Sequence, residues 1–213
     1  MEYWADNVGT IRPPGHWNVN AQFVSKRDNH ILDDDVKMFF ILNNALFDAG
    51  IAAWDAKITY DSVRPRSAIR FLFKSKNVVA WGGPREGAKL IKGENWNPYI
   101  TTPPFAEFVS GHSTFSAAAS QILQLFTRSN NYNNSVIIPR HSSDIEPGTT
   151  PKKDITLSWR TFTEAANQAG FSRRLGGIHF KDGDLEGRKL GSKIGEIVFE
   201  KATTFIEGTA NGF

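Results

Sequence analysis

The amino-acid sequence predicts an all-α fold, a helical bundle that forms a single domain over residues 1–213. Four long segments carry apolar residues at spacings of three and four, which is typical of helices with one buried face. Apolar and polar residues alternate only in two short runs, Arg70 to Phe73 and Val78 to Trp81, so no sheet is expected. The chain has no internal repeat, linker or shift in composition, and 213 residues fit one core.

The first expected helix runs from about residue 34 to 60. Three aspartates, Asp33 to Asp35, stand at its start, where carboxylates stabilise the positive end of the helix dipole. Pro65 ends it, because proline pushes the preceding residue toward an extended conformation. Its apolar stripe consists of Val36, Phe39, Phe40, Leu42, Ala45, Leu46, Ala49 and Ala53.

The second expected helix begins near Ser113, and its many alanines permit close packing against other helices. The third runs from Leu157 to about Ala169, and the fourth from Leu185 to about Ile206. Two irregular stretches separate these helices, Lys74 to Phe108 and Arg128 to Lys153. Loops of this length usually carry function or disorder.

Composition excludes several classes of function. Lysine plus arginine total 25 against 22 for aspartate plus glutamate, and this net charge of +3 is far from the dense basic surface that binds nucleic acid. The absence of cysteine excludes disulfides, thiolate metal sites and a cysteine nucleophile. Polar residues interrupt the most apolar region, Val36 to Trp54, so no membrane span is expected. The first residues lack the order of a signal peptide, and the compartment stays unassigned.

Three short segments place a cation or a histidine beside residues that begin or end helices. Lys57 lies seven residues, about two helical turns, before Arg64. Residues 110–112 read Ser-Gly-His and precede the alanine-rich helix, where N–H groups and the helix dipole favour an anion. Arg173 lies six residues before His179, across a glycine pair.

Together these segments could hold a tetrahedral oxyanion. Three cationic side chains match its charge, the arginines as forks and the lysine as a point charge. Ser110 and Gly111 add neutral donors. Of the two imidazoles, His112 and His179, one could attack or ligate the central atom while the other exchanges a proton. Each segment alone also has a purely structural explanation, because charges, serines and glycines are common at helix ends.

The combined pattern resembles the signature of the type 2 phosphatidic acid phosphatase (PAP2) superfamily, which includes bacterial acid phosphatases and vanadium-dependent haloperoxidases. That signature is a lysine, six residues and Arg-Pro, then Ser-Gly-His, then Ser-Arg, five residues and a histidine, and it spans Lys57 to His179 here. The resemblance implies an all-α bundle with a vanadate cofactor, or phosphate in the same site. It makes His179 the vanadium ligand or the phosphorylated nucleophile, and His112 the acid/base. The residues that would hold the oxyanion oxygens are Lys57, Arg64, Ser110, Gly111 and Arg173.

Three further segments resemble the haloperoxidase branch more than the small acid phosphatases, namely 48–57, 102–108 and 176–180. In that branch, an aromatic residue three before the motif lysine and a residue seven before the motif histidine shape the halide pocket. These positions hold Trp54 and Phe105, a chloroperoxidase-like pair. Two aromatic rings would desolvate a halide, and two ordinary core aromatics are the alternative interpretation.

The chain departs from the family pattern at two positions. Val109 replaces the usual proline before Ser-Gly-His, and Gly183 replaces the aspartate that usually follows the last histidine by four residues. A carboxylate beside a ligating histidine fixes its tautomer. Either flanking acid, Asp182 or Asp184, could take this role, and Asp48 could instead pair with a cation. All three could equally cap helices or face solvent.

Haloperoxidases of this family are longer and build two helical bundles, and this chain resembles the C-terminal bundle. We expect a fragment, a truncated gene product or a minimal member, and an exposed apolar helix face would then favour a homo-oligomer. The first hypothesis is a vanadium-dependent haloperoxidase that oxidises halide with hydrogen peroxide at a His-ligated vanadate. The alternatives are an acid phosphatase that forms a phosphohistidine from a phosphate ester, and a non-catalytic fragment that retains the fold.

Overall fold

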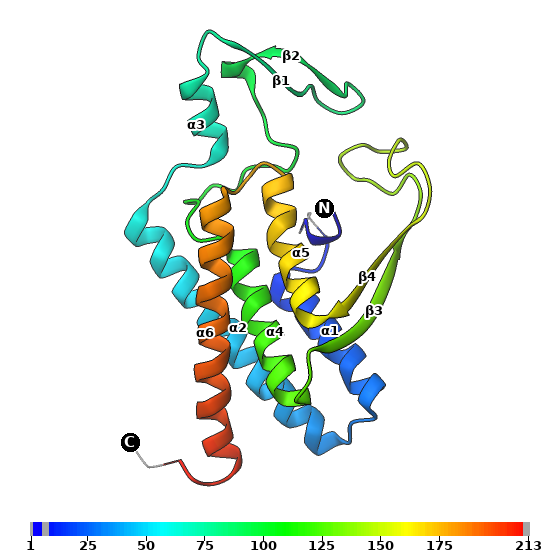
Figure 1. Cartoon of the computed structure of the whole chain (residues 1–213), viewed down its shortest axis with the longest axis vertical. Helices are drawn as coiled ribbons and strands as arrows, with labels where there is room; N and C mark the ends of the chain where they lie inside the picture. The colour runs from blue at the N-terminus through cyan, green and yellow to red at the C-terminus, as the bar shows by residue number, and fades with distance from the viewer. Residues whose placement is uncertain (1, 6–8, 211–213) are drawn as a thin grey trace.

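The computed structural model describes residues 2–5 and 9–210. Figure 1 shows a bundle of long helices from which two β-hairpins project. The helices are α1 (Pro13–Asp28), α2 (Leu32–Tyr60), α3 (Pro65–Leu72), α4 (Gly111–Thr127), α5 (Phe162–Leu175) and α6 (Lys181–Ile206). The strands are β1 (Asn77–Trp81), β2 (Ala88–Lys92), β3 (Asn131–Ile138) and β4 (Ile155–Thr161), and short 3-10 turns cover Glu2–Trp4 and Gly93–Asn95.

Helix α4 lies at the centre and packs against α2, α5 and α6. Its contact with α6 is close because glycines recur every fourth residue along one face of α6, at Gly187, Gly191 and Gly195. A Cβ atom on Gly187 would lie 2.9 Å from the Ser110 carbonyl oxygen, and one on Gly195 would lie 2.9 Å from that of Ala118. This close approach fixes the start of α4 against the first turns of α6.

The hydrophobic core fills the space between these helices. Large side chains from five elements are fully buried in it, among them Trp17, Met38, Leu42, Ile122 and Phe162. The mainly helical architecture confirms the predicted fold class. The helix expected over 34–60 is confirmed as α2, and the one expected near Ser113 is α4.

The helix expected from Leu157 is wrong over its first turn. Residues 155–161 form β4, which pairs antiparallel with β3, and α5 begins only at Phe162. Thr161 sets this boundary, because its hydroxyl accepts the N–H of Glu164 at 3.0 Å while the Glu164 carboxylate accepts the N–H of Thr161 at 3.2 Å. Such a capping box starts a helix regardless of the apolar spacing before it.

Apolar spacing predicts neither α1 nor α3, and it predicts neither hairpin. Pro13 and Pro65 each occupy the first helical position, where proline loses no hydrogen bond, so Pro65 begins a helix as well as following one. Helix α6 also starts at Lys181, before the expected Leu185. The hairpin β1–β2 and the strand β3 lie in the two stretches expected to be irregular, and β4, which pairs with β3, follows the second of them.

Among the described residues, one helical stretch, Leu32–Leu72, is long and apolar enough to cross a membrane by length and composition alone. A core helix of a bundle passes the same test. In α2, Leu42, Ala45 and Ala49 are fully buried, and the helix packs on α4 and α6. We therefore interpret α2 as a core helix.

Candidate functional site

The predicted site residues come together at one end of the bundle. The C-terminal ends of α2 and α5 and the N-terminal ends of α4 and α6 lie at this end, the upper one in Figure 1. A cavity of about 1190 Å³ opens there. The predicted residues that line it are Trp54, Phe105, Gly111, His112, Arg173 and His179, whereas Lys57, Arg64 and Ser110 lie behind its wall.

Lys57 is buried in the last turn of α2. Its ammonium group donates to the carbonyl oxygens of Ala106 at 2.9 Å, Glu107 at 3.1 Å and Val109 at 2.5 Å. A lysine has three donors, so these bonds use all of them and hold the 106–109 segment against α2. Burial, together with the charge of Arg64, lowers the pKa of Lys57 to about 7.

Arg64 connects the two sides of the site. Its guanidinium donates to the carbonyl oxygens of Phe105 and Ile178, each at 2.8 Å, and to that of Ala106 at 3.1 Å. Its Nη1 also lies 3.0 Å from Nε2 of His179. Burial lowers the pKa of Arg64 to about 10, so the group keeps its charge and donates. Nε2 of His179 is therefore the acceptor.

His179 is held on its other side by Glu107. The distance from Nδ1 of His179 to Oε1 of Glu107 is 2.7 Å, and each side chain is only 4% exposed. Burial, followed by the charge of Arg64, lowers the pKa of His179 well below its usual value. Burial raises the pKa of Glu107. Because Nε2 of this neutral imidazole accepts from Arg64, its proton is on Nδ1 and donates to Oε1 of Glu107, which leaves the Nε2 lone pair directed away from Glu107.

Neither Asp182 nor Asp184, the acids expected beside His179, occupies that position, so this expectation is corrected. Asp48 and Asp182 are exposed. Asp184 is fully buried, but it accepts from Ser113 Oγ at 2.8 Å and from Arg188, and it therefore joins α4 to α6. Glu107 was missed, although it lies in the 102–108 segment. Its only sequence signal is a lone acid in an otherwise uncharged run.

The start of α4 supplies neutral donors. Ser110 is the N-cap residue, and its hydroxyl accepts the N–H of Ser113 at 3.3 Å. Its own N–H donates to the carbonyl oxygen of Gly183 at 2.9 Å. The first N–H groups of a helix have no partner inside the helix, and here they belong to Gly111 and His112. A Cβ on Gly111 would lie 3.5 Å from the Trp54 ring, at ordinary contact distance, so this part of the backbone lies against the cavity wall.

Arg173 and two aromatic rings complete the wall. Arg173 is buried at the end of α5, and its Nη1 donates to the Trp4 carbonyl oxygen. The ring centroids of Trp54 and Phe105 are 5.3 Å apart, and both side chains are 41% exposed. The Lys57 ammonium lies 5.3 Å and the Arg64 guanidinium 5.1 Å from the centroid of the Phe105 ring. The predicted pair of aromatics thus lies next to the buried cations.

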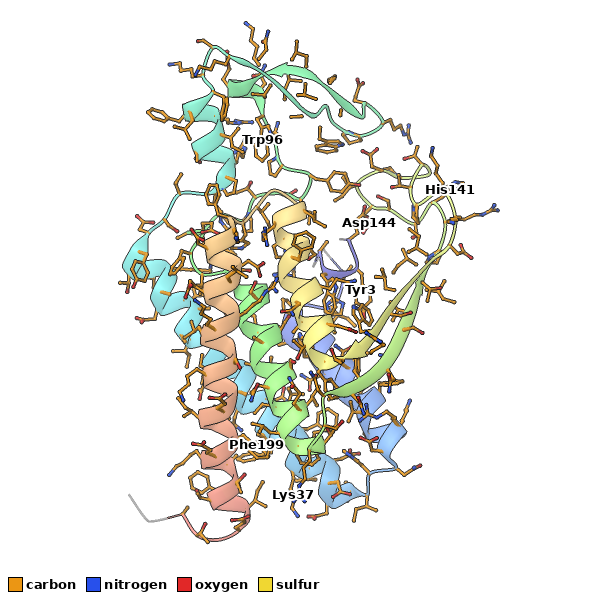
Figure 2. All side chains as sticks on the ribbon, viewed as in Figure 1. Tyr3, Lys37, Trp96, His141, Asp144 and Phe199 are labelled. Carbon is orange, nitrogen blue, oxygen red and sulfur yellow. The ribbon has the colours of Figure 1, made fainter. Side chains whose placement is uncertain are left out.

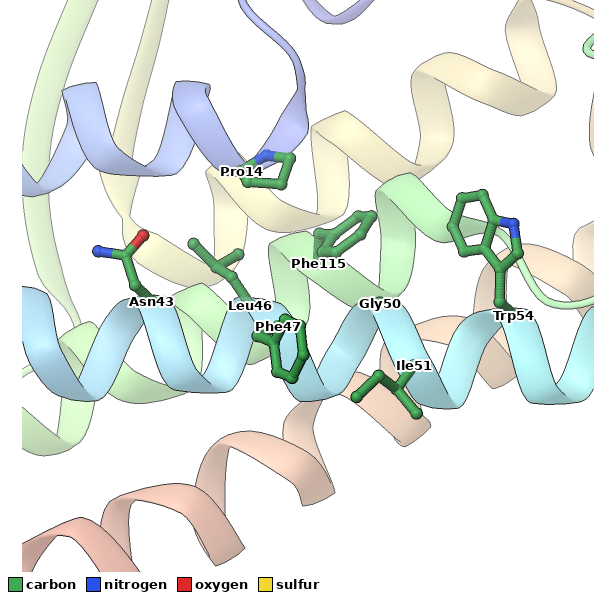
Figure 3. Close-up of a pocket in the computed structure, with 8 residues that line it drawn as sticks. All are labelled: Pro14, Asn43, Leu46, Phe47, Gly50, Ile51, Trp54 and Phe115. Carbon is green, nitrogen blue, oxygen red and sulfur yellow. The ribbon is translucent and has the colours of Figure 1, made fainter.

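An apolar groove continues from Trp54 along the outer face of α2. Figure 3 shows its lining side chains, which come from α1, α2 and α4. Trp54 and Phe115 line both this groove and the larger cavity. Phe47 and Ile51 are more than half exposed on the same face. An exposed apolar helix face is therefore present, and a homo-oligomer stays a prediction.

The donor set fits an oxyanion better than a bare metal cation. No group of three or more His, Cys, Asp or Glu residues that could hold a metal ion occurs in the part of the chain that the structure describes. The positive charge of two buried guanidinium groups and a lysine, together with helix N–H groups and one imidazole acceptor, instead matches a tetrahedral anion whose central atom binds nitrogen. Vanadate and phosphate both have this form.

Fold and site thus define a helical-bundle protein with a cavity next to buried cations and a histidine held in one orientation. The family model for the VCPO second helical-bundle domain matches residues 37–208. The chain belongs to this vanadium haloperoxidase family.

Relatives of known structure or name agree. The vanadium chloroperoxidase of Curvularia inaequalis is 26% identical over 58% of this chain and 22% of its own length. The structure of a holo-type bacterial vanadium-dependent chloroperoxidase superposes with a TM-score of 0.85 at 27% identity, over 92% of this chain and 42% of the other. A bacterial vanadium-dependent iodoperoxidase gives a TM-score of 0.72 at 27% identity, over 94% and 42%. The chain spans less than half of the length of each.

Proposed function

We propose that this chain forms the vanadate-binding bundle of a vanadium-dependent haloperoxidase, which oxidises a halide with hydrogen peroxide. The observation that carries the proposal is the ring of His179, held between Glu107 and Arg64 with Nε2 as the acceptor. A neutral imidazole with one nitrogen fixed as a donor and the other as an acceptor is the form that binds a metal centre. An oxyanion bound through Nε2 would take the place of the present bond to Arg64, which would then donate to its oxygens.

Each predicted residue has a role in this proposal. Arg64, Arg173 and the N–H groups at the start of α4 would hold the oxygens, and Lys57 would add buried positive charge. His112, on the cavity wall, would exchange protons with an oxygen of the bound group. Bound vanadate supplies the activation of hydrogen peroxide. Trp54 and Phe105 would exclude water from the halide.

The names of the relatives support this function, and so does membership of the family. Because the chain spans less than half of these relatives, its own activity is part of the proposal.

The test uses the 213-residue chain with vanadate. Vanadate should raise the melting temperature, because a ligand that binds only the folded state stabilises it. With vanadate, hydrogen peroxide and bromide or chloride, the protein should then halogenate monochlorodimedone. Excess phosphate should inhibit by competing for the site. The matched control is His141→Asn, which should leave these results unchanged. His141 is exposed and has a positive φ, a conformation that asparagine tolerates.

Two results would contradict the proposed function. Turnover of phosphate esters without halogenation at any pH would identify the acid phosphatase alternative, with His179 as the nucleophile. No response to any oxyanion, in melting temperature or in turnover, would identify a non-catalytic fragment.

A further inference from the structure

We propose that Glu107 is the positioning residue that orients His179, and that Gly183 keeps open the space that the Glu107 carboxylate occupies. The ligand role of His179 rests on the proposed function, whereas the orientation of its ring does not. No sequence motif contains the Glu107–Gly183 pair, because the two residues come from different segments.

The Glu107 carboxylate contacts two consecutive residues. Its Oε1 accepts from Nδ1 of His179 at 2.7 Å and from the backbone N–H of Phe180 at 3.0 Å. The backbone bond fixes the carboxylate relative to the first turn of α6, and the ring bond then fixes the imidazole relative to the carboxylate. Glu107 itself is held by its carbonyl oxygen, which accepts from Lys57. The ring orientation therefore depends on a chain of short contacts that begins in α2.

Gly183 belongs to the same arrangement for a steric reason. It lies in the first turn of α6, four residues after His179. A Cβ on Gly183 would overlap Oε1 of Glu107 and would lie 2.8 Å from its Cδ. A side chain at 183 and the carboxylate of Glu107 thus exclude each other. The carbonyl oxygen of Gly183 also accepts the N–H of Ser110, which ties this turn to the start of α4.

The chemical consequence is a fixed tautomer. A carboxylate at Nδ1 keeps the proton on that nitrogen and leaves Nε2 as the acceptor. The Arg64 guanidinium at 3.0 Å from Nε2 favours the same tautomer from the opposite side, because it can only donate. Without Glu107, only Arg64 would orient the ring, and it would have to exchange this bond for the oxyanion.

The first measurement reads the tautomer directly, without vanadate. Long-range ¹H–¹⁵N correlation NMR distinguishes the two nitrogens of each imidazole, and His179→Ala assigns the His179 signals. We expect an Nδ1–H imidazole in the wild type and a mixture with Nε2–H in Glu107→Ala. Vanadate affinity should fall by about 10–100-fold in Glu107→Ala. It should fall less in Glu107→Gln, whose amide oxygen still accepts from Nδ1–H. Glu94→Gln, which changes an exposed carboxylate bonded to the Ser75 N–H, should alter neither measurement.

The second measurement moves the carboxylate from position 107 to position 183. Gly183→Asp alone should weaken vanadate binding, because the new side chain displaces Glu107. Glu107→Ala combined with Gly183→Asp should restore the Nδ1–H tautomer and most of the affinity, because an aspartate at 183 can then enter the vacated space. Such non-additivity is expected only for groups that share one contact. The double variant also carries the test if Glu107→Ala alone does not fold.

Three results would overturn the proposal: an Nε2–H tautomer in the wild type, an unchanged tautomer in Glu107→Ala, or a double variant no better than Glu107→Ala. If the wild type binds no vanadate, the proposed function fails, while the NMR comparison still decides the role of Glu107.

Discussion

At the inner end of the cavity, buried cations bond to the backbone and to a histidine of the site, whereas at the outer end two glutamates join loops to one another. Lys57 and Arg64 at the inner end donate to carbonyl oxygens of the 105–109 and 178 segments. At the outer end, Glu146 accepts from Trp81 Nε1 at 2.9 Å and from the Arg85 N–H at 2.6 Å.

The outer end also includes the N-terminal residues. Glu2 accepts from Ser143 Oγ at 2.6 Å and from the Asp144 N–H at 3.0 Å. Figure 2 shows Asp144 and His141 on the connection between β3 and β4, with Tyr3 nearer to α5. The outer contacts thus connect three segments that are distant in sequence, over a cavity that Trp81 and Asp144 also line.

The two ends of the cavity therefore differ in what they determine: the inner end determines the chemistry of binding, and the outer end determines the shape of the cavity. A buried charge costs free energy unless its partners are fixed, so the inner end specifies one arrangement of donors. The outer contacts lie on loops, and such contacts adjust more easily. We therefore expect changes at the inner end to affect oxyanion binding and changes at the outer end to affect mainly stability.

His179→Ala should have the largest effect. It removes the only imidazole nitrogen that Glu107 and Arg64 hold as an acceptor, so vanadate should no longer raise the melting temperature. In the wild type, vanadate at about 100 times its dissociation constant should add about 2.7 kcal/mol to the free energy of unfolding. Thermal unfolding with and without vanadate measures both. A full vanadate shift in His179→Ala would mean that the inner end binds the anion by charge alone.

Most of the inner end could be predicted from the sequence, because its residues lie in short motifs at helix ends. Residues 110–112 are consecutive, and Arg173 and His179 lie six residues apart. Glu107 could not be assigned, since its partner is 72 residues away and nothing local distinguishes it from a surface acid. The aspartates near His179 were better candidates by distance along the chain, yet helix geometry directs Asp184 toward Ser113.

The outer end could not be predicted for the same reason. Trp81 and Glu146 are 65 residues apart, and a hairpin that contains Gly82, Gly83 and Pro84 reads as an irregular loop. The β4 strand was assigned to a helix because Leu157, Trp159 and Phe162 fit either period over so short a run. Spacing determines which face of a long helix is buried, but it does not determine which distant strands pair.

Loss of the Lys57 proton as the pH rises should change stability and anion affinity by an amount between those of the other two predictions. Its folded pKa of about 7 lies below the usual lysine value of 10.5 in the unfolded chain. Between these two values the unfolded chain holds more protons, so the stability that this group contributes rises with pH. Anion affinity should change in the opposite direction, because the charge is lost. It should fall severalfold from pH 7 to 8, with about tenfold per pH unit as the upper limit.

Sulfate is the suitable probe for this effect, since its charge is constant over this range. Calorimetric titration at pH 6 to 9 measures the affinity, and denaturant unfolding measures stability over the same range. Lys57→Met is the control, because any pH dependence left in it belongs to other groups. If sulfate affinity changes equally with pH in the wild type and in Lys57→Met, Lys57 keeps its proton throughout this range.

Trp81→Phe should have the smallest effect, because it keeps the ring but removes the Nε1–H that bonds Glu146. The Phe ring still packs on Tyr99, whose ring centroid lies 5.0 Å from that of Trp81, and Glu146 keeps the Arg85 N–H. The melting temperature should fall by about 2–4 °C, as for the loss of one ordinary hydrogen bond in a chain of this size. Vanadate affinity should not change, and Val79→Ala, an exposed change in the same strand, should alter neither quantity. A loss of affinity in Trp81→Phe comparable to that in His179→Ala would mean that the loops of the outer end set the geometry of the inner one.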